Sequence, residues 1–129
     1  MFMKYYIFHK FQAESFKQTN VDFLFAGVLP AKSEAIGMAK AMSETGIPCI
    51  LSFVIRKSGS LLDGNIINDV ISEIDNTITL KPLCYMVNCV HPTVLQEALL
   101  NPRNKTALGK GTSNRNASKY IYSKSRESK

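Results

Sequence analysis

The stretch PCILSFVI, residues 48–55, is an unbroken apolar run with the length of one β-strand. Polar and apolar residues do not alternate in it, which is typical of a strand covered on both faces. Two further runs of strand-forming residues, VDFLFAGVLP (21–30) and LCYMVN (83–88), lie before and after it. The sequence therefore predicts strands that start near residues 21, 48 and 83.

Segments with helical spacing separate these runs. In residues 5–18 the spacing of the apolar side chains suits one face of a helix; these are Tyr6, Ile7, Phe11, Ala13 and Phe16. Residues 31–46 read as a helix that ends before Gly46, where a left-handed residue is favoured. Helices are also predicted over 65–75 and 92–100, the latter with Pro92 in its first turn, and a weak strand follows from 106.

Helices and strands alternate in this order, which predicts an α/β fold with right-handed βα units and a parallel sheet. A doubly wound sheet and part of a (βα)8 barrel both satisfy the pattern. In either fold, ligands bind at the carboxyl ends of the strands. Those ends are residues 26–28, residues 53–55 with the loop to Gly64, and residues 88–91.

The 129 residues are enough for one domain with its own core. No run approaches the roughly 18–20 apolar residues of a membrane helix, and the N-terminus lacks a secretory signal. A cytoplasmic protein is expected. The three cysteines, Cys49, Cys84 and Cys89, are odd in number, so reduced thiols are favoured over disulfides.

The net charge of +6 comes from the C-terminal part of the chain. Residues 1–100 hold eight Lys/Arg and nine Asp/Glu, whereas residues 101–129 hold eight Lys/Arg and one Glu. Basic tails attract phosphates, but this one contains no RNA-reading motif. Nucleic-acid binding is therefore not favoured, and residues 119–129 are expected to form a polar, poorly ordered tail.

Several side chains at the predicted strand ends have two readings. Cys89 could be a zinc ligand or a nucleophile near the start of a helix, or a small buried side chain. His91 could carry a proton or cap the following helix. Asp63 could hold a substrate amine or close an Asx turn before Asn65. Cys49 and Cys84 are expected to pack in the core.

Three segments carry a resemblance to a known family: VDFLFAGVLPAKSEA, LSFVIRKSGSLLDG and YMVNCVHP, in that order. With GTSNRNAS at 111–118, they resemble the homocysteine S-methyltransferase family over residues 9–118. The resemblance implies that residues 1–118 are a partial homocysteine-binding domain, an incomplete (βα)8 TIM barrel. It also implies zinc as cofactor, and L-homocysteine and a methyl donor as partners, with methionine as product.

The resemblance places Cys89 on the first of three cysteine zinc ligands and makes Asn88 its motif partner. Ser52 and Asp63, in the 52–64 region that lines the same mouth, are then substrate-binding candidates. Two departures stand out. Gly27 occupies a position where many members carry a Glu that helps hold the substrate amino group, and the family's later pair of adjacent cysteines (GGCC) is absent.

The chain is therefore expected to be a fragment or degenerate copy that does not transfer methyl groups alone. Whether it acts as an enzyme stays open at this point. The alternative is a non-catalytic remnant, or a binding module built on a half barrel. Because an incomplete barrel leaves unpaired sheet edges, self-association through those edges is a further possibility.

Overall fold

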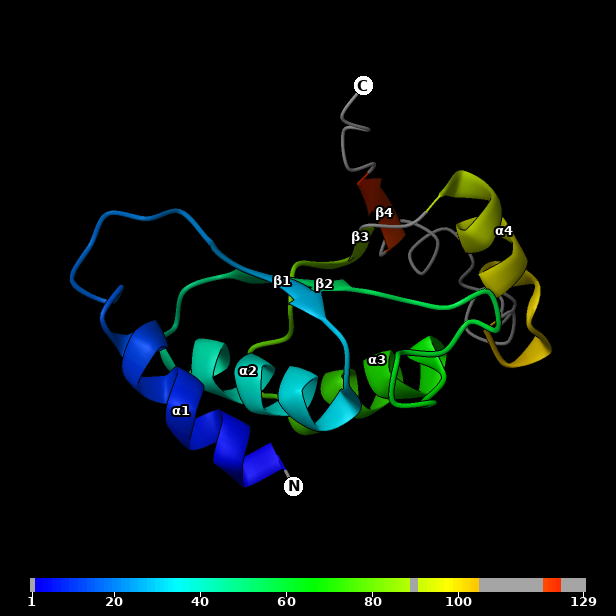
Figure 1. Cartoon of the computed structure of the whole chain (residues 1–129). Coiled ribbons are helices and arrows are strands. Elements are labelled where there is room, and N and C mark those ends of the chain that lie inside the picture. Colours follow the sequence, from blue (N-terminus) through cyan, green and yellow to red (C-terminus); the bar gives the residue numbers. More distant parts are fainter. Residues whose placement is uncertain (1, 89–90, 105–119, 124–129) are drawn as a thin grey trace.

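The computed structural model describes residues 2–88, 91–104 and 120–123, and in them helices and strands alternate (Figure 1). The predicted order is confirmed up to residue 100, with strands a few residues shorter than the apolar runs. The weak strand expected from residue 106 lies outside the described residues. The elements are α1 (Phe2–Glu14), β1 (Leu24–Leu29), α2 (Lys32–Glu44), β2 (Cys49–Phe53), α3 (Ile67–Thr77), β3 (Cys84–Asn88), α4 (Pro92–Leu100) and β4 (Tyr120–Ser123).

The four described strands form one sheet in the order β1-β2-β3-β4, and every neighbouring pair is parallel. This confirms the expected α/β class with a parallel sheet. All strands therefore end at the same edge, which carries the residues that follow each strand.

One face of the sheet packs against helices (Figure 1). Leu51 and Tyr85 are register partners, so they lie on the same face, and both are almost fully buried. The Tyr85 hydroxyl donates to Asp75 Oδ1 of α3 at 2.7 Å, which identifies this face as the one that meets the helices. The core lies between this face and the layer formed by α2 and α3.

The helices α2 and α3 follow the predicted patterns. Ala35, Ala39 and Met42 of α2 are buried, and Gly46 follows the helix end with φ +76°, as its position indicated. The α3 side chains expected in the core are buried: Ile67, Val70, Ile71 and Ile74. Ile66, also expected there, is half-buried and precedes the helix.

The apolar face predicted for α1 is confirmed at Tyr6 and Ala13 but wrong at Ile7 and Phe11. Ile7 and Phe11 are 65% and 85% exposed, while His9 and Ala13 are buried. Two residues correspond to roughly 200° around a helix, so these two pairs point in opposite directions. Because α1 packs on α2, where the Tyr6 hydroxyl donates to Glu44 Oε2 at 2.6 Å, only a narrow side of α1 is covered.

The structure also differs from the expected C-terminal tail. Tyr120–Ser123 forms β4 beside β3, within the 119–129 segment that was assigned no strand. Tyr and Ile favour strands, but a run of four residues surrounded by Lys and Ser gives too little periodicity to be recognised.

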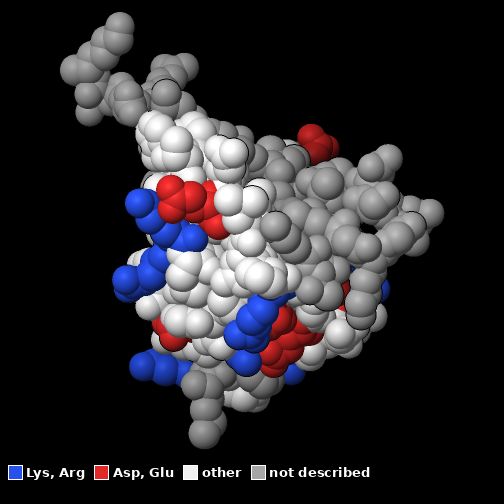
Figure 2. Space-filling model, turned by 90° about the vertical axis from the view of Figure 1, so that its right-hand side faces the viewer, with Lys and Arg blue, Asp and Glu red and all other residues white. Residues whose placement is uncertain are grey.

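The described surface mixes both signs of charge. On the face shown in Figure 2, basic and acidic side chains lie next to one another. Lys32 pairs with Glu73 at 3.0 Å, and Arg103 pairs with Asp69. None of the described helices is long and apolar enough to cross a membrane.

Candidate functional site

A hydrogen bond joins two of the predicted site residues across neighbouring strands. The Ser52 hydroxyl donates to Asn88 Oδ1 at 2.6 Å. Ser52 belongs to β2 and is fully buried, and Asn88 is the last residue of β3 and is half-buried. The sequence placed both residues near the mouth but did not predict their direct contact.

This pair faces away from the helix layer. Ser52 is the register partner of Met86, and Asn88 lies two residues after Met86, so the three side chains share one face of the sheet. Leu51 and Tyr85 occupy the opposite face, where Tyr85 contacts α3. The Ser52–Asn88 pair therefore lies on the face that α2 and α3 do not cover (Figure 1).

Asp63 lies at the same edge of the sheet, in the loop after β2. The Leu62 N–H donates to Pro30 O at 3.0 Å, which holds this loop beside the carboxyl end of β1. The Asp63 carboxylate accepts from the Lys32 N–H at 2.7 Å and from the Asn65 N–H at 3.0 Å. The Asx turn weighed for this residue is thus present, and Asp63 also caps the start of α2.

These hydrogen bonds determine the ionisation of Asp63. Partial burial by itself raises the pKa of the carboxyl, but the bonds from the Lys32 and Asn65 N–H groups and the Asn65 amide outweigh it. The pKa of Asp63 is therefore lower than its ordinary value. The carboxylate stays charged at neutral pH, at the edge where a substrate amine was expected to bind.

A buried residue that the sequence did not single out anchors the loop over this edge. Asn104 is fully buried, and its Nδ2 donates to Ala98 O at 2.8 Å and Gly59 O at 3.3 Å. Its Oδ1 accepts from the Asn68 N–H in the first turn of α3 at 3.2 Å. One amide thus links α4, the loop and α3. A lone Asn in the polar stretch NPRNK carries no periodic signal, so only the tertiary structure reveals it.

The two described cysteines lie at the amino-terminal ends of their strands, opposite the carboxyl ends that carry the candidate site. Cys49 and Cys84 are the first residues of β2 and β3, whereas Asn88 is the last residue of β3. Burial, with a smaller contribution from Cys84, raises the pKa of the Cys49 thiol to about 11. Cys49 is in the core as predicted. Cys84 is only half-buried, because its side chain lies on the face of the sheet that α2 and α3 do not cover.

His91 serves as the N-cap of α4. Its Nδ1 accepts from the Thr93 N–H at 3.2 Å and lies 2.8 Å from the Thr93 hydroxyl. The capping role weighed for His91 is therefore confirmed. Cys89, the predicted zinc ligand, lies outside the described residues.

The carboxyl end of β1 has an unusual backbone. The register of β1 with β2 shifts between Ala26 and Leu29, and Val28 has φ +58°, which is strained for a β-branched residue. Gly27, at the position where a substrate-holding Glu was expected from the resemblance, is exposed beside this bulge. The bulge ends the regular strand and turns the chain toward Pro30.

The described residues do not fit a zinc centre. In residues 2–88, 91–104 and 120–123, no group of three or more His, Cys, Asp and Glu side chains could hold a metal ion. Cys84 is four residues from Asn88, roughly 13 Å along a strand, so it cannot join a site at the carboxyl edge. His91 is engaged at Nδ1 by Thr93.

The comparisons with known proteins agree with the fold and the motifs. A search of curated proteins gave no match. A family model described as homocysteine S-methyltransferase matches residues 1–124, which is nearly the whole chain. The chain therefore belongs to the homocysteine S-methyltransferase family.

Proposed function

We propose that the chain forms part of a homocysteine-binding site at the carboxyl edge of its sheet, within an incomplete (βα)8 barrel. The observation that carries this proposal is the Ser52–Asn88 hydrogen bond at the carboxyl ends of two adjacent parallel strands. Asn88 directly precedes Cys89 in the sequence, and the chain is a member of the family whose resemblance places a zinc ligand at Cys89. In a barrel, the helix-free face of the sheet points to the barrel interior, and substrates bind at the carboxyl end of the strands, where Asn88 lies.

Each predicted residue then has a defined task. Because the Ser52 hydroxyl donates to Oδ1, the Asn88 amide is held in one orientation and can position a polar substrate group. Asp63, charged and fixed by Lys32 and Asn65, is suited to attract the substrate ammonium group. This charge would substitute for the Glu that Gly27 replaces.

Cys89 is proposed to supply one thiolate ligand to zinc, which in this family holds the homocysteine thiol as a thiolate. The remaining cysteines cannot complete the ligand set, because Cys49 and Cys84 begin their strands at the other edge. The chain alone is therefore proposed to bind the metal weakly and not to catalyse methyl transfer.

A zinc titration of single-cysteine variants tests the role of Cys89. We expect Cys89→Ala to weaken zinc binding at least about tenfold, measured by competition with a chromogenic chelator, because a thiolate ligand is lost. Cys84→Ala is the matched control and should bind zinc as the unmodified chain does. Equal binding by the unmodified chain and Cys89→Ala would overturn the assignment.

A further inference from the structure

The helix α1 carries an apolar stripe that no described element covers. Met3, Ile7 and Phe11 follow one another at intervals of four residues, so they form one row along the helix, and Phe8 lies beside this row. Ile7, Phe8 and Phe11 are 65%, 71% and 85% exposed, and Met3 is 47% exposed. These four residues are called the outer stripe below. Contiguous exposed apolar side chains of this kind mark interaction sites.

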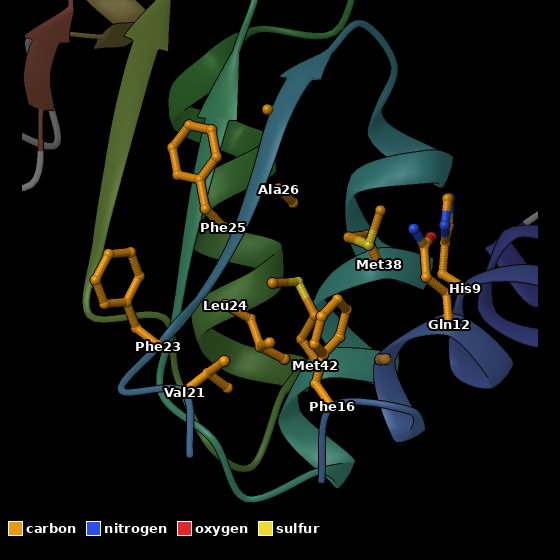
Figure 3. Close-up of a pocket in the computed structure, with 12 residues that line it drawn as sticks. His9, Gln12, Phe16, Val21, Phe23, Leu24, Phe25, Ala26, Met38 and Met42 are labelled. Atoms are coloured by element: carbon orange, nitrogen blue, oxygen red, sulfur yellow. The ribbon is translucent and has the colours of Figure 1, made fainter. Parts of the chain in front are cut away.

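The outer stripe points away from the sheet. His9 and Ala13, each two residues after a member of the row, are buried on the opposite side of the helix. Figure 3 shows this inner side, where His9 and Gln12 line a cavity of about 390 Å³ beside β1 and α2. A further strand at the edge of β1 would lie on the inner side and would leave Ile7 and Phe11 exposed. An extension of the sheet therefore does not account for the outer stripe.

A groove lies beside the N-terminal half of the outer stripe. Its volume is about 500 Å³, and its lining includes Lys4, Ile7 and Phe8 of α1. Residues with this spacing form part of the hole that receives a side chain from a neighbouring helix. Phe11 projects from the next turn and is the most exposed large apolar side chain in the described part of the chain. The same surface thus holds a projecting ring and a groove that could receive one.

We propose that the outer stripe binds the outer stripe of a second copy of the chain, in a twofold pair with antiparallel α1 helices. A twofold interface uses the same surface on both copies, so Phe11 of each copy meets the groove of the other. Phe11 lies toward the C-terminal end of the stripe and the groove beside its N-terminal half, so they meet when the helices run in opposite directions. Ile7 of one copy then lies next to Phe11 of the other. This inference does not depend on the methyl-transfer proposal.

The exposed area of the outer stripe is sufficient for a stable dimer. A fully exposed side chain of this size offers roughly 200 Å² of surface, so the exposed fractions of the four residues correspond to roughly 500 Å² on each copy. Two copies would then bury on the order of 1,000 Å², which is the size at which specific interfaces begin.

The charges of α1 favour a second copy over a membrane surface as the partner. Helices that lie on lipid surfaces have a polar face rich in Lys and Arg, which is attracted to anionic lipids. The Lys10 Nζ lies 4.0 Å from the Glu14 carboxylate and 3.9 Å from that of Glu44. These acidic neighbours offset the charge of Lys10, so α1 offers little attraction to anionic lipids.

Sedimentation equilibrium of the full chain tests the pair. The unmodified chain should show a reversible equilibrium between monomer and dimer. Ile7→Lys and Phe11→Glu should each weaken the dimer at least about tenfold, because each would bury an unpaired charge in the interface. The matched control Leu100→Lys places a charge at an exposed apolar position of α4 and should dimerise normally.

A mixture of the two weakened variants tests the antiparallel arrangement. In the proposed pair, position 7 of one copy lies next to position 11 of the other. An equimolar mixture of Ile7→Lys and Phe11→Glu should therefore recover the dimer, since the two introduced charges are opposite in sign and meet in the mixed pair. In a parallel pair the introduced charges would not meet, and the mixture would stay dissociated. Circular dichroism of each variant checks that the fold is retained.

Several results would overturn the proposal. These are an unmodified chain that remains monomeric, folded variants that dimerise as well as the unmodified chain, or a mixture that recovers no dimer. A monomeric chain that co-sediments with vesicles of phosphatidylcholine and phosphatidylserine, and loses this binding with Phe11→Glu, would assign the outer stripe to a lipid surface instead.

Discussion

At the scale of single residues, the loop over the carboxyl edge depends on a glycine with close neighbours. Gly59 has φ +83°, and a Cβ there would lie 2.7 Å from Ala98 O and in collision with the Asn104 amide. Gly64 has φ +90°, but a Cβ there would meet nothing within 4 Å. Both glycines thus have a left-handed backbone conformation, but only Gly59 lacks room for a side chain.

We therefore expect Gly59→Ala to destabilise the protein more than Gly64→Ala. Both variants incur roughly 1–2 kcal/mol for a left-handed non-glycine residue, and only Gly59→Ala also displaces Asn104 or Ala98. Urea unfolding followed by circular dichroism measures both. Equal midpoints for the two variants would contradict the buried contact between Asn104 and the loop.

The charge of Asp63 gives a pH-dependent contribution to stability. Its pKa is lower in the folded protein, so its hydrogen bonds stabilise the fold above the ordinary pKa, and this stabilisation is lost as pH falls through the folded pKa. Asp63→Asn should lower the Tm at pH 6, and the difference from the unmodified chain should shrink as the pH is lowered toward 3. A difference that stays constant over this range would show that the ionised carboxylate is not what Lys32 and Asn65 bind.

Some features of the candidate site could be predicted from local sequence patterns, and others could not. Cys49 is buried as predicted, and the turn weighed for Asp63 and the cap weighed for His91 are both present. Strand position, a following Asn and a following Pro are local signals, so the sequence alone could indicate them. The contact between Ser52 and Asn88 joins residues 36 apart and follows only from the sheet register. Asn104 was missed for the same reason, since its partners lie on three other segments.

At the scale of elements, β2 and α3 were predictable, whereas the buried face of α1 and the strand β4 were not. β2 lies between β1 and β3 and is apolar except for Ser52, and α3 shows its helical period clearly. The buried face of α1 was predicted wrongly at Ile7 and Phe11, because these two apolar side chains are exposed. The β4 strand depends on pairing with β3 more than on its own four residues.

The helix α4 offers a test of its cap. His91→Ala should remove the acceptor for the Thr93 N–H and lower the free energy of unfolding by about 1 kcal/mol. His91→Asn keeps a capping acceptor and should restore most of the loss. Chemical denaturation of the three proteins measures this, and equal stabilities of His91→Ala and His91→Asn would mean that the cap contributes nothing.

At the scale of the whole molecule, the described sheet begins at a strand with a free edge and has one face that α2 and α3 leave uncovered. The parallel βα order, the family match and the position of Ser52–Asn88 all fit part of a (βα)8 barrel. The proposed zinc site is incomplete, because the resemblance implies three cysteine ligands and assigns only Cys89 of this sequence to that set.

The most direct test of this account is an assay of methionine formation. The purified chain is incubated with L-homocysteine, S-methylmethionine or another methyl donor, and stoichiometric zinc, beside an active homocysteine S-methyltransferase as positive control. The account predicts no turnover by the chain alone, because Cys89 cannot hold a catalytic zinc without further ligands. Measurable turnover with stoichiometric bound zinc would contradict it.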